Sequence, residues 1–515
     1  MTDPVIESLK PAWALLCPAL SSILILLSGR RPNLRETWTI LASLLQFILV
    51  LSMAPWVTQG YIIESYLFRD ILPQVHFGFR VDAFGLLFAL TASFLWILVS
   101  LYSIGYMRAL KEHAQTRYYF CFALAILGAM GVALSGNLVT LFVFYEILTI
   151  STYPLVAHEQ SQEALFAGRK YLAYLLTSGV FLLAAIAWTY SLVGTTDFSP
   201  KGILNSIPLL HSTLSILFVL FILGFMKAAY IPFHSWLPTA MVAPTPVSAL
   251  LHAVAVVKAG VFGIVRVVCY VYGIDLLKQL GLGTLLSSFA AITMIGASLF
   301  AIAQDNLKRR LAYSTISQLS FIIFGVGLLT PMGITGAMIH IPFHGLMKIT
   351  LFLCAGAILV ASGKTEISEM AGIGRVMPLT MIAFTIGALG MCGAPPIAGF
   401  ISKWYLSLGA IQSGYWVFLA LILIASLLDV VYFYPIIRTA FFEKIPKNEV
   451  LEEKEPKVQL FSEPPPSLER EQPLFVFLII PIGMTAILSI LVCLFPNLFY
   501  IYPLIQRAIQ NLSGG

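Results

Sequence analysis

The chain has 515 residues, of which 59% are hydrophobic and only 10% charged, and its mean hydropathy is +0.91. A soluble domain cannot bury so much apolar surface, so the composition excludes a globular protein of the aqueous phase. The formal net charge of +6 does not require a nucleic-acid partner, because an uneven distribution of basic residues between loops explains it.

Apolar stretches that can cross about 30 Å of hydrocarbon recur from Trp13 to Val492. They predict an all-α integral membrane protein of about fourteen transmembrane helices. In chain order the predicted helices are 13–29, 36–56, 82–104, 118–135, 138–157, 171–194, 213–230, 248–272, 280–302, 309–329, 333–360, 378–412, 415–441 and 474–496. The start, MTDPVIESLK, carries two acidic residues and no basic n-region, so no cleavable signal peptide is expected.

Basic residues concentrate in alternate loops. With the N-terminus outside, about 18 Lys and Arg fall in cytoplasmic loops and about 6 in outer ones. We therefore expect a multi-pass protein of the cell (inner) membrane with both termini periplasmic or extracellular. The longest polar interruption, 443–473, is rich in Glu, Lys and Pro and predicts a flexible cytoplasmic linker, with a docking strip for a neighbouring protein of the same complex as the alternative.

Two proline-rich breaks interrupt apolar regions, where an irregular backbone is costly unless protein or a cavity surrounds it. The first spans 231–246, directly after Lys227, and the second spans 393–399, directly before Lys403. The prolines assigned to the broken backbone are Pro232, Pro244, Pro246, Pro395 and Pro396. Broken helices in two parts of one chain are typical of inverted repeats with a site at the midplane.

We therefore predict two related five-helix units, helices 4–8 and 9–13, each containing one broken helix. The predicted divisions are 1–112 for the first three helices, 113–275 and 276–442 for the two repeats, 443–473 for the linker, and 474–515 for the last helix and tail.

Ionisable residues inside the predicted helices are the candidates for function, because each costs several kcal/mol in the membrane. As proton-pathway residues we select Glu146, Lys227, His252, Lys258, His340, His344, Lys348, Lys403 and Asp429. The role of Asp429 stays open between pairing with Lys403, lining an exit and bonding neighbouring side chains. Arg266 and Arg438 lie near helix ends and are expected to extend to the interface.

His340, His344 and Lys348 are spaced at i, i+4 and i+8, which places them on one helix face in steps of about 6 Å. One or two waters span such a gap, and imidazole can accept a proton on one nitrogen and donate from the other. This histidine–lysine ladder predicts proton transfer, with a satisfied interior network as the alternative. His252 is a further relay candidate, and His234 either caps freed backbone or carries protons.

The six cysteines (Cys17, Cys121, Cys269, Cys354, Cys392 and Cys493) are scattered singly. We expect them to pack, and we predict no metal site, no cofactor and no redox centre on this chain. Three other classes of protein share some of these features: a haem-binding cytochrome, a transporter of organic anions, and a membrane scaffold. The lysines that accompany the histidines favour proton transfer over haem, and the cost of buried charge disfavours a scaffold.

At the same residues the chain resembles the antiporter-like family, which comprises the proton-pumping subunits of respiratory complex I and the A and D subunits of Mrp-type cation/proton antiporters. The resemblance covers about residues 80–440 and is carried by KAAYIPFHSWLPTAMVAPTPVSALLHAVAVVKAGVF, DNLKRRLAYSTISQLSF, HIPFHGLMKITLF and PPIAGFISKW. It implies that Glu146 and Lys227 form a switching pair, that Lys258 and Lys403 occupy the family's other lysine positions, and that the histidine–lysine ladder lies on a central hydrated axis.

The resemblance implies a proton-translocating protein, which exchanges protons for Na⁺ in antiporter members and works with other membrane subunits in the lipid bilayer. By this resemblance, Lys403 differs from the glutamate that one complex I subunit carries there and favours the D subunit of Mrp-type antiporters or another member with lysine at this position. The alternatives are a membrane component of a complex I-like NADH-quinone oxidoreductase, of an ion-coupled hydrogenase or of an inorganic-carbon uptake system. No nucleic-acid partner is expected, and any redox chemistry belongs to other chains.

Overall fold

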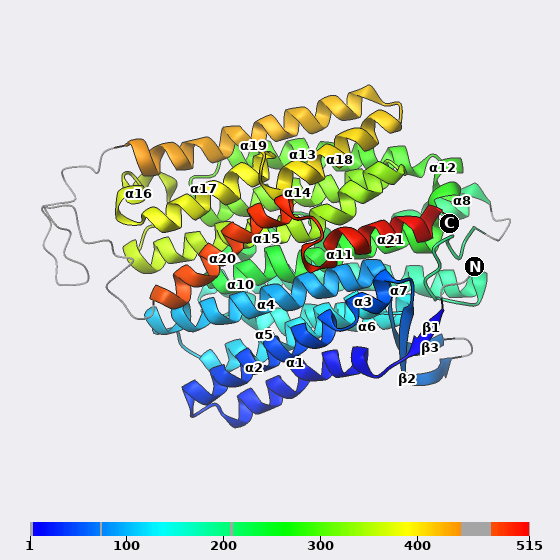
Figure 1. Cartoon of the computed structure of the whole chain (residues 1–515), viewed down its shortest axis with the longest axis horizontal. Coiled ribbons are helices and arrows are strands. Elements are labelled where there is room, and N and C mark those ends of the chain that lie inside the picture. The colour runs from blue at the N-terminus through cyan, green and yellow to red at the C-terminus, as the bar shows by residue number, and fades with distance from the viewer. Residues whose placement is uncertain (1–3, 73–74, 206–209, 444–474, 514–515) are drawn as a thin grey trace, which may run out of the picture.

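In the computed structural model the long helices run side by side, roughly parallel or antiparallel, along the longest axis (Figure 1). The structure describes residues 4–72, 75–205, 210–443 and 475–513. Within these ranges, eleven helices are long and apolar enough to cross a membrane. A helix satisfies its own backbone hydrogen bonds, which is why apolar stretches adopt it in lipid. The all-α multi-pass fold is confirmed, whereas the count of fourteen crossings and the linker 443–473, which lies beyond Glu443 outside the described residues, stay predictions.

The eleven long helices follow one another along most of the chain. They are α1 (Lys10–Leu27), α2 with α3 (Pro32–Leu51 and Ala54–Thr58), α4 (Ala83–Ala109), α5 (Gln115–Leu134), α6 (Leu138–Val156), α7 (Gln162–Val193), the run α10, η3, α11 and η4 (Thr245–Ala249, Leu250–Val254, Val256–Arg266 and Val267–Tyr272), α13 (Leu282–Ile302), α15 (Pro331–Ser362), α19 (Trp416–Phe442) and α20 (Phe475–Leu494). A further long helix, α14 (Leu307–Gly327), starts with three basic residues and lies among them.

Both predicted broken helices are broken. The first consists of α8 (His211–Gly224), η1 (Met226–Ala228), α9 (Trp236–Thr239) and η2 (Ala240–Val242). The second was predicted as one helix over 378–412 but is two, α17 (Pro378–Cys392) and α18 (Ala398–Gln412). Proline lacks the N–H that a helix interior needs, so each proline-rich segment ends a helix. Each break also contains one cis bond before proline, at Pro232 and at Pro396.

A small sheet closes one end of the bundle, which we call the sheet end (Figure 1). Strands β1 (Val5–Glu7) and β2 (Ile62–Leu72) are parallel, and β2 pairs antiparallel with β3 (Val75–Val81) in a register that places Glu64 opposite Arg80. These strands were not predicted. The region after α20 was predicted as a tail, but it contains η7 (Leu498–Tyr500) and α21 (Ile501–Ser513).

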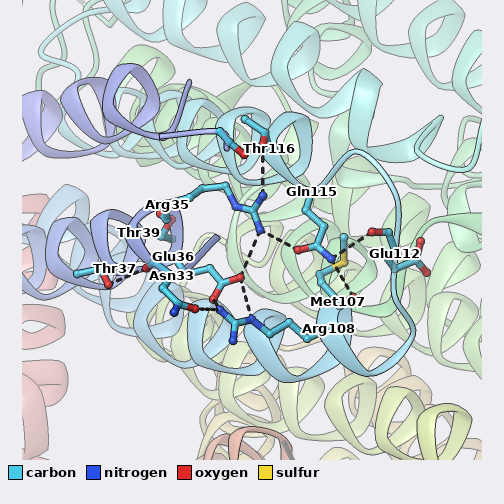
Figure 2. A network of polar contacts seen from close by, with 11 residues as sticks. Asn33, Arg35, Glu36, Thr37, Thr39, Met107, Arg108, Glu112, Gln115 and Thr116 are labelled. Carbon is cyan, nitrogen blue, oxygen red and sulfur yellow. Dashed lines mark hydrogen bonds and ion pairs between the residues drawn. The ribbon is translucent and has the colours of Figure 1, made fainter. Parts of the chain in front are cut away.

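The opposite end carries most of the basic loops, and we call it the basic end. There a buried network joins α2 to α4 and α5 (Figure 2). Arg35 donates to Gln115 at 2.8 Å and to Glu36 at 3.3 Å, and Glu36 also forms an ion pair with Arg108. Arg35 and Glu36 are 4% and 3% exposed. Because each charge has an opposite partner, the network fastens the first hairpin of helices to the rest of the bundle.

The second helix of each five-helix unit begins with the same arrangement, which we call the asparagine device. An asparagine side chain caps the helix, and the backbone of that asparagine bridges a residue that follows the next helix. Asn137 caps α6 and forms a backbone bridge with Asp197, which follows α7. Asn306 caps α14 and bridges Glu366, which follows α15. The first device lies beside β3 at the sheet end, and the second lies at the basic end, so the two units are inverted relative to each other. Two short helices, α12 (Ile274–Gln279) and α16 (Ile373–Val376), and a single turn, η5 (Ile367–Glu369), complete the fold.

Candidate functional site

Nearly all the ionisable side chains selected from the sequence are buried. Lys227, His252, Lys258, His340, His344, Lys348 and Asp429 are 0% exposed, and Lys403 is 6% exposed. Glu146 on α6 is less buried than the others. Burial in an apolar bundle is expensive for charged groups unless other polar atoms surround them, so the partners of these side chains decide what they can do.

In the second unit a continuous hydrogen-bonded chain joins two lysines. Lys348 on α15 donates to Ser314 on α14 at 2.8 Å, and the Ser314 hydroxyl lies 2.8 Å from the hydroxyl of Tyr432 on α19. Tyr432 donates to Asp429 at 2.6 Å, and Asp429 pairs with Lys403 on α18 at 2.6 Å. We call these five residues the polar bridge. Every link is a short hydrogen bond or ion pair, so the five side chains form one connected polar line between α15 and α18.

The two histidines of the histidine–lysine ladder continue this polar line from the first unit toward α18. Lys258 Nζ on α11 lies 2.7 Å from His344 Nδ1, and the rings of His344 and His340 have centroids 5.7 Å apart. His340 Nδ1 lies 2.8 Å from the hydroxyl of Ser402, which neighbours Lys403 in sequence. The Nε2 atoms of both histidines are buried and have no hydrogen-bond partner within the described part of the chain. The structure therefore brings Lys258, the two histidines and α18 together along one line.

The ring of His252 packs 4.6 Å from that of Phe352, close to this line. Both of its ring nitrogens are buried and have no hydrogen-bond partner among the residues that the structure describes. It belongs to the π-helical turn η3, which follows Pro244 and Pro246 at the start of α10. A π-helical turn redirects side chains within a helix and is frequent at functional sites.

Glu146 and Lys227 lie near each other, but they do not form an ion pair within 4 Å. Lys227 Nζ instead donates to the carbonyl oxygen of Tyr145 at 2.6 Å and lies 3.0 Å from the centroid of the Tyr145 ring. The Glu146 Oε1 atom is buried and has no hydrogen-bond partner among the described residues. The expected contact is thus indirect, through the residue that precedes the glutamate.

Two glycines permit the close approach of the backbone around this pair. A Cβ on Gly260 of α11 would lie 2.6 Å from the carbonyl carbon of Lys227, and one on Gly179 of α7 would lie 2.5 Å from Glu146 Oε1. At Gly260 a side chain would clash with backbone atoms, so this glycine sets the distance between the broken helix and α11, whereas at Gly179 it would meet the flexible end of the Glu146 side chain. Lys227 is consequently held against the helix that carries Lys258.

Three polar residues at or beside the polar bridge, Ser314, Gln318 and Tyr432, were not predicted from the sequence. Their side chains are neutral, so they lack the free-energy cost in the membrane by which the charged candidates were selected. Ser314 and Gln318 are four residues apart on α14, and Gln318 donates to Asp429 at 2.8 Å. Tyr432 follows Asp429 by three residues. Spacings of i, i+4 and i, i+3 place each pair on one helix face, so these spacings in the sequence could have indicated two polar faces. Of the three roles that the sequence leaves open for Asp429, the structure shows two: it pairs with Lys403, and it accepts hydrogen bonds from neighbouring side chains.

Arg266 does not extend to the interface as predicted. It is 1% exposed, forms an ion pair with Asp82 at the start of α4, and lies over the rings of Phe84, Phe262 and Tyr270. Asp82 is also the cap of α4, since it accepts from the Gly85 N–H at 2.7 Å. A partner 184 residues away in sequence could not be predicted from the chain alone. Arg438, by contrast, is exposed.

A cavity of about 290 Å³ opens at the basic end, between the two units. Lys308, Glu159, Val242, Ala355 and Leu359 are among the residues that line it. Ala355 lies seven residues beyond Lys348 on α15, which is about 10 Å along the helix. The cavity therefore lies on the basic-end side of the polar bridge, and its nearest α15 lining residue is about 10 Å from Lys348 along the helix.

Comparison with known protein families matches the part of the chain that carries these buried residues. Residues 135–429 match the family described as NADH:quinone oxidoreductase/Mrp antiporter, transmembrane, and residues 73–119 match the N-terminus of complex I chain 5. The chain belongs to the NADH:quinone oxidoreductase/Mrp antiporter family. The match contains every selected pathway residue from Glu146 to Asp429.

Relatives come from both branches of this family. The chain is 33% identical over 363 residues to the N subunit of the NADH-quinone oxidoreductase of Desulforudis audaxviator, covering 69% of this chain and 71% of the relative. It is 32% identical over 412 residues to the A subunit of the Na⁺/H⁺ antiporter of Alkalihalophilus pseudofirmus, covering 76% of this chain. The chain spans only 50% of the length of that antiporter protein.

Solved structures share the whole fold. A chain of the Mrp complex from Dietzia sp. aligns with a TM-score of 0.83 at 22% identity, and a chain of an archaeal membrane-bound sulfane sulfur reductase aligns with 0.82 at 26% identity. Each alignment covers 98% of both chains. The protein is thus a multi-pass membrane subunit of the antiporter and complex I-like type.

Proposed function

We propose that this chain translocates protons as one membrane component of a larger complex. The supporting observation is the polar bridge, in which four successive contacts of 2.6 to 2.8 Å connect Lys348 to Lys403 through residues on four helices. A static interior would need only one counter-ion for each lysine, whereas a serine and a tyrosine hydroxyl between them provide groups that both accept and donate protons.

In this proposal protons enter from the basic end through the cavity near Lys308 and reach Lys348. They pass along the polar bridge to Lys403 on the second broken helix, while Lys227, Lys258 and the two ladder histidines serve the first unit. The buried imidazole nitrogens of His252, His340 and His344 without protein partners suit relay by water, since a buried polar atom needs some partner.

The host is proposed to be an Mrp-type cation/proton antiporter, with this chain as its D subunit, or a complex I-like NADH-quinone oxidoreductase. The antiporter relative from Alkalihalophilus pseudofirmus is an A subunit, so the D assignment rests on Lys403. Partners would be the other membrane proteins of the complex, as in the neighbouring multi-subunit structures, and Na⁺ would be the exchanged ion in the antiporter case. The basic end would face the cytoplasm and both termini the outside.

The test compares two tyrosines on α19 in the complete complex reconstituted into vesicles. Tyr432→Phe keeps the ring and removes the hydroxyl from the polar bridge, and we expect proton transport to fall at least about tenfold. Tyr434→Phe is the matched control, because Tyr434 lies two residues away and is 59% exposed. Equal transport by both variants, with equal incorporation into the complex, would contradict the proposal.

A further inference from the structure

A cluster of potential metal ligands lies at the basic end, away from the polar bridge and the ladder. It consists of Glu112 and His113, in the loop between α4 and α5, and His158, in the loop between α6 and α7. One ligand atom from each residue lies within 4.8 Å of the other two. The sequence did not reveal this cluster, because 45 residues separate His113 from His158.

His158 is the observation that points to a ligand. Its side chain is 0% exposed, yet neither ring nitrogen has a hydrogen-bond partner in the described protein. Its Nε2 atom lies 3.8 Å from Glu112 Oε2, which is too long for a hydrogen bond, and its ring lies 4.8 Å from that of His113. A buried imidazole normally satisfies at least one nitrogen, so its orientation toward two other donors requires an explanation.

The surrounding residues hold this imidazole in place from the backbone side. Arg117 donates to the carbonyl oxygen of His158 at 2.8 Å, and the Tyr118 ring packs edge-on at 6.0 Å. The ring therefore stays on the side of Glu112 and His113, which lie 3.8 Å away (Oε2 to Nε2) and 4.8 Å away (ring to ring).

The carboxylate of Glu112 is not used by the network in Figure 2. Gln115 donates to the backbone carbonyl oxygen of Glu112 at 3.1 Å, whereas the side chain points away from Arg35 and Glu36 (Figure 2). Glu159 and Lys308 are the other charged groups that act on this carboxylate, one of each sign. The carboxylate is therefore available to a ligand on the side of the two histidines.

We propose that Glu112, His113 and His158 bind a divalent transition-metal ion, with Zn²⁺ as the best fit. Two imidazoles and one carboxylate are a recurrent Zn²⁺ ligand set that leaves a fourth position for water. Tetrahedral bonds of about 2.0–2.2 Å need donors about 3.4 Å apart. Glu112 and His113 lie in a short surface loop, so side-chain rotation can supply the remaining contraction. The bound ion would join the α4–α5 loop to the α6–α7 loop.

The test uses the full-length protein purified in detergent, freed of metal with a chelator and titrated with Zn²⁺. We expect one saturable site per chain, a rise in the thermal unfolding temperature with Zn²⁺, and a tetrahedral ligand-field spectrum when Co²⁺ replaces Zn²⁺. His113→Gln should weaken binding at least about tenfold without disturbing the fold, because His113 is exposed. Glu112→Gln should act in the same direction.

His211→Gln is the matched control, since His211 is also exposed but lies at the start of α8. It should leave Zn²⁺ affinity unchanged. Two results would overturn the proposal: no saturable Zn²⁺ binding by the unsubstituted chain, or binding of equal affinity by His113→Gln and Glu112→Gln and the unsubstituted chain. Because every readout is binding or stability, the result is independent of whether the chain transports protons.

Discussion

Lys403 on α18 and Asp429 on α19 form a buried ion pair 2.6 Å long, and the same carboxylate also accepts hydrogen bonds from Tyr432 and Gln318. The second broken helix is thereby connected to the polar bridge through a single carboxylate. This pair and the other buried contacts of the bundle can each be tested by substitution, in the reconstituted complex or in the purified chain.

Asp429→Asn should reduce proton transport at least about tenfold, because it keeps the shape of the side chain but leaves Lys403 without its counter-ion. If the pair were only structural, replacing both residues by apolar ones would restore function, since such replacements often preserve stability. We expect the Lys403→Met/Asp429→Leu double variant to assemble and still not transport. Vesicles with a pH-sensitive dye provide the measurement, and wild-type rates in the double variant would contradict this prediction.

Lys227→Ala and Glu146→Gln should each abolish proton movement in vesicles. Lys227 is buried and donates to the backbone carbonyl oxygen of Tyr145, with no ion-pair partner within 4 Å among the described residues, so its charge state depends on the field of the nearby Glu146 carboxylate. Lys278→Ala is the control, because Lys278 on α12 is exposed at the sheet end. Unaltered pumping by both pathway variants would exclude the pair from the route.

Gly260→Ala should displace the broken helix from α11 and thereby lower both transport and stability. The added methyl group would overlap the backbone at Lys227, and overpacking of this kind typically costs about 1–3 kcal/mol. Gly483→Ala is a suitable comparison, since a Cβ at Gly483 meets no atom within 4 Å. The thermal unfolding temperature in detergent measures the effect on stability, and no difference between the two variants would argue against close packing at Gly260.

Asp82→Asn should destabilise the protein by about 3–5 kcal/mol, because it leaves the buried guanidinium of Arg266 uncompensated. Replacing both residues, by Leu and Met, should recover a large part of the loss. The same unfolding measurement applies, with Arg438→Gln as a control at an exposed arginine. A double variant no more stable than Asp82→Asn would show that the ion pair itself, and not the unpaired charge, determines stability.

The helices and the breaks could be predicted because they depend on local properties. Apolar length identifies a membrane helix, and proline clusters interrupt it wherever they occur. The burial of most of the selected ionisable residues could also be predicted, since a charged residue inside an apolar stretch is recognisable from the sequence alone. The predicted helix 213–230 ends six residues later than α8, because Phe225–Tyr230 is apolar except for Lys227 and nothing local distinguishes η1 from the preceding helix.

Partnerships between distant segments could not be predicted. Tyr432 is one aromatic residue among many in α19, and only the fold places its hydroxyl between Ser314 and Asp429. Arg266 was assigned to the interface because its helix position allowed it, whereas the fold supplies Asp82. The strands at the sheet end were missed for a related reason, since β1 is only three residues long and pairs with a segment 57 positions later.

The paired asparagine devices have a consequence for experiments on this chain. Asn137 and Asn306 perform the same task in the two units, one beside Asp197 and the other beside Glu366, at opposite ends of the molecule. Each unit therefore serves as an internal reference for the other. A cap removed by Asn→Ala costs about 1 kcal/mol in either place, so any difference between the two losses of stability would report the further bond of each side chain, from Asn137 to the carbonyl oxygen of His76 and from Asn306 to the Glu366 carboxylate.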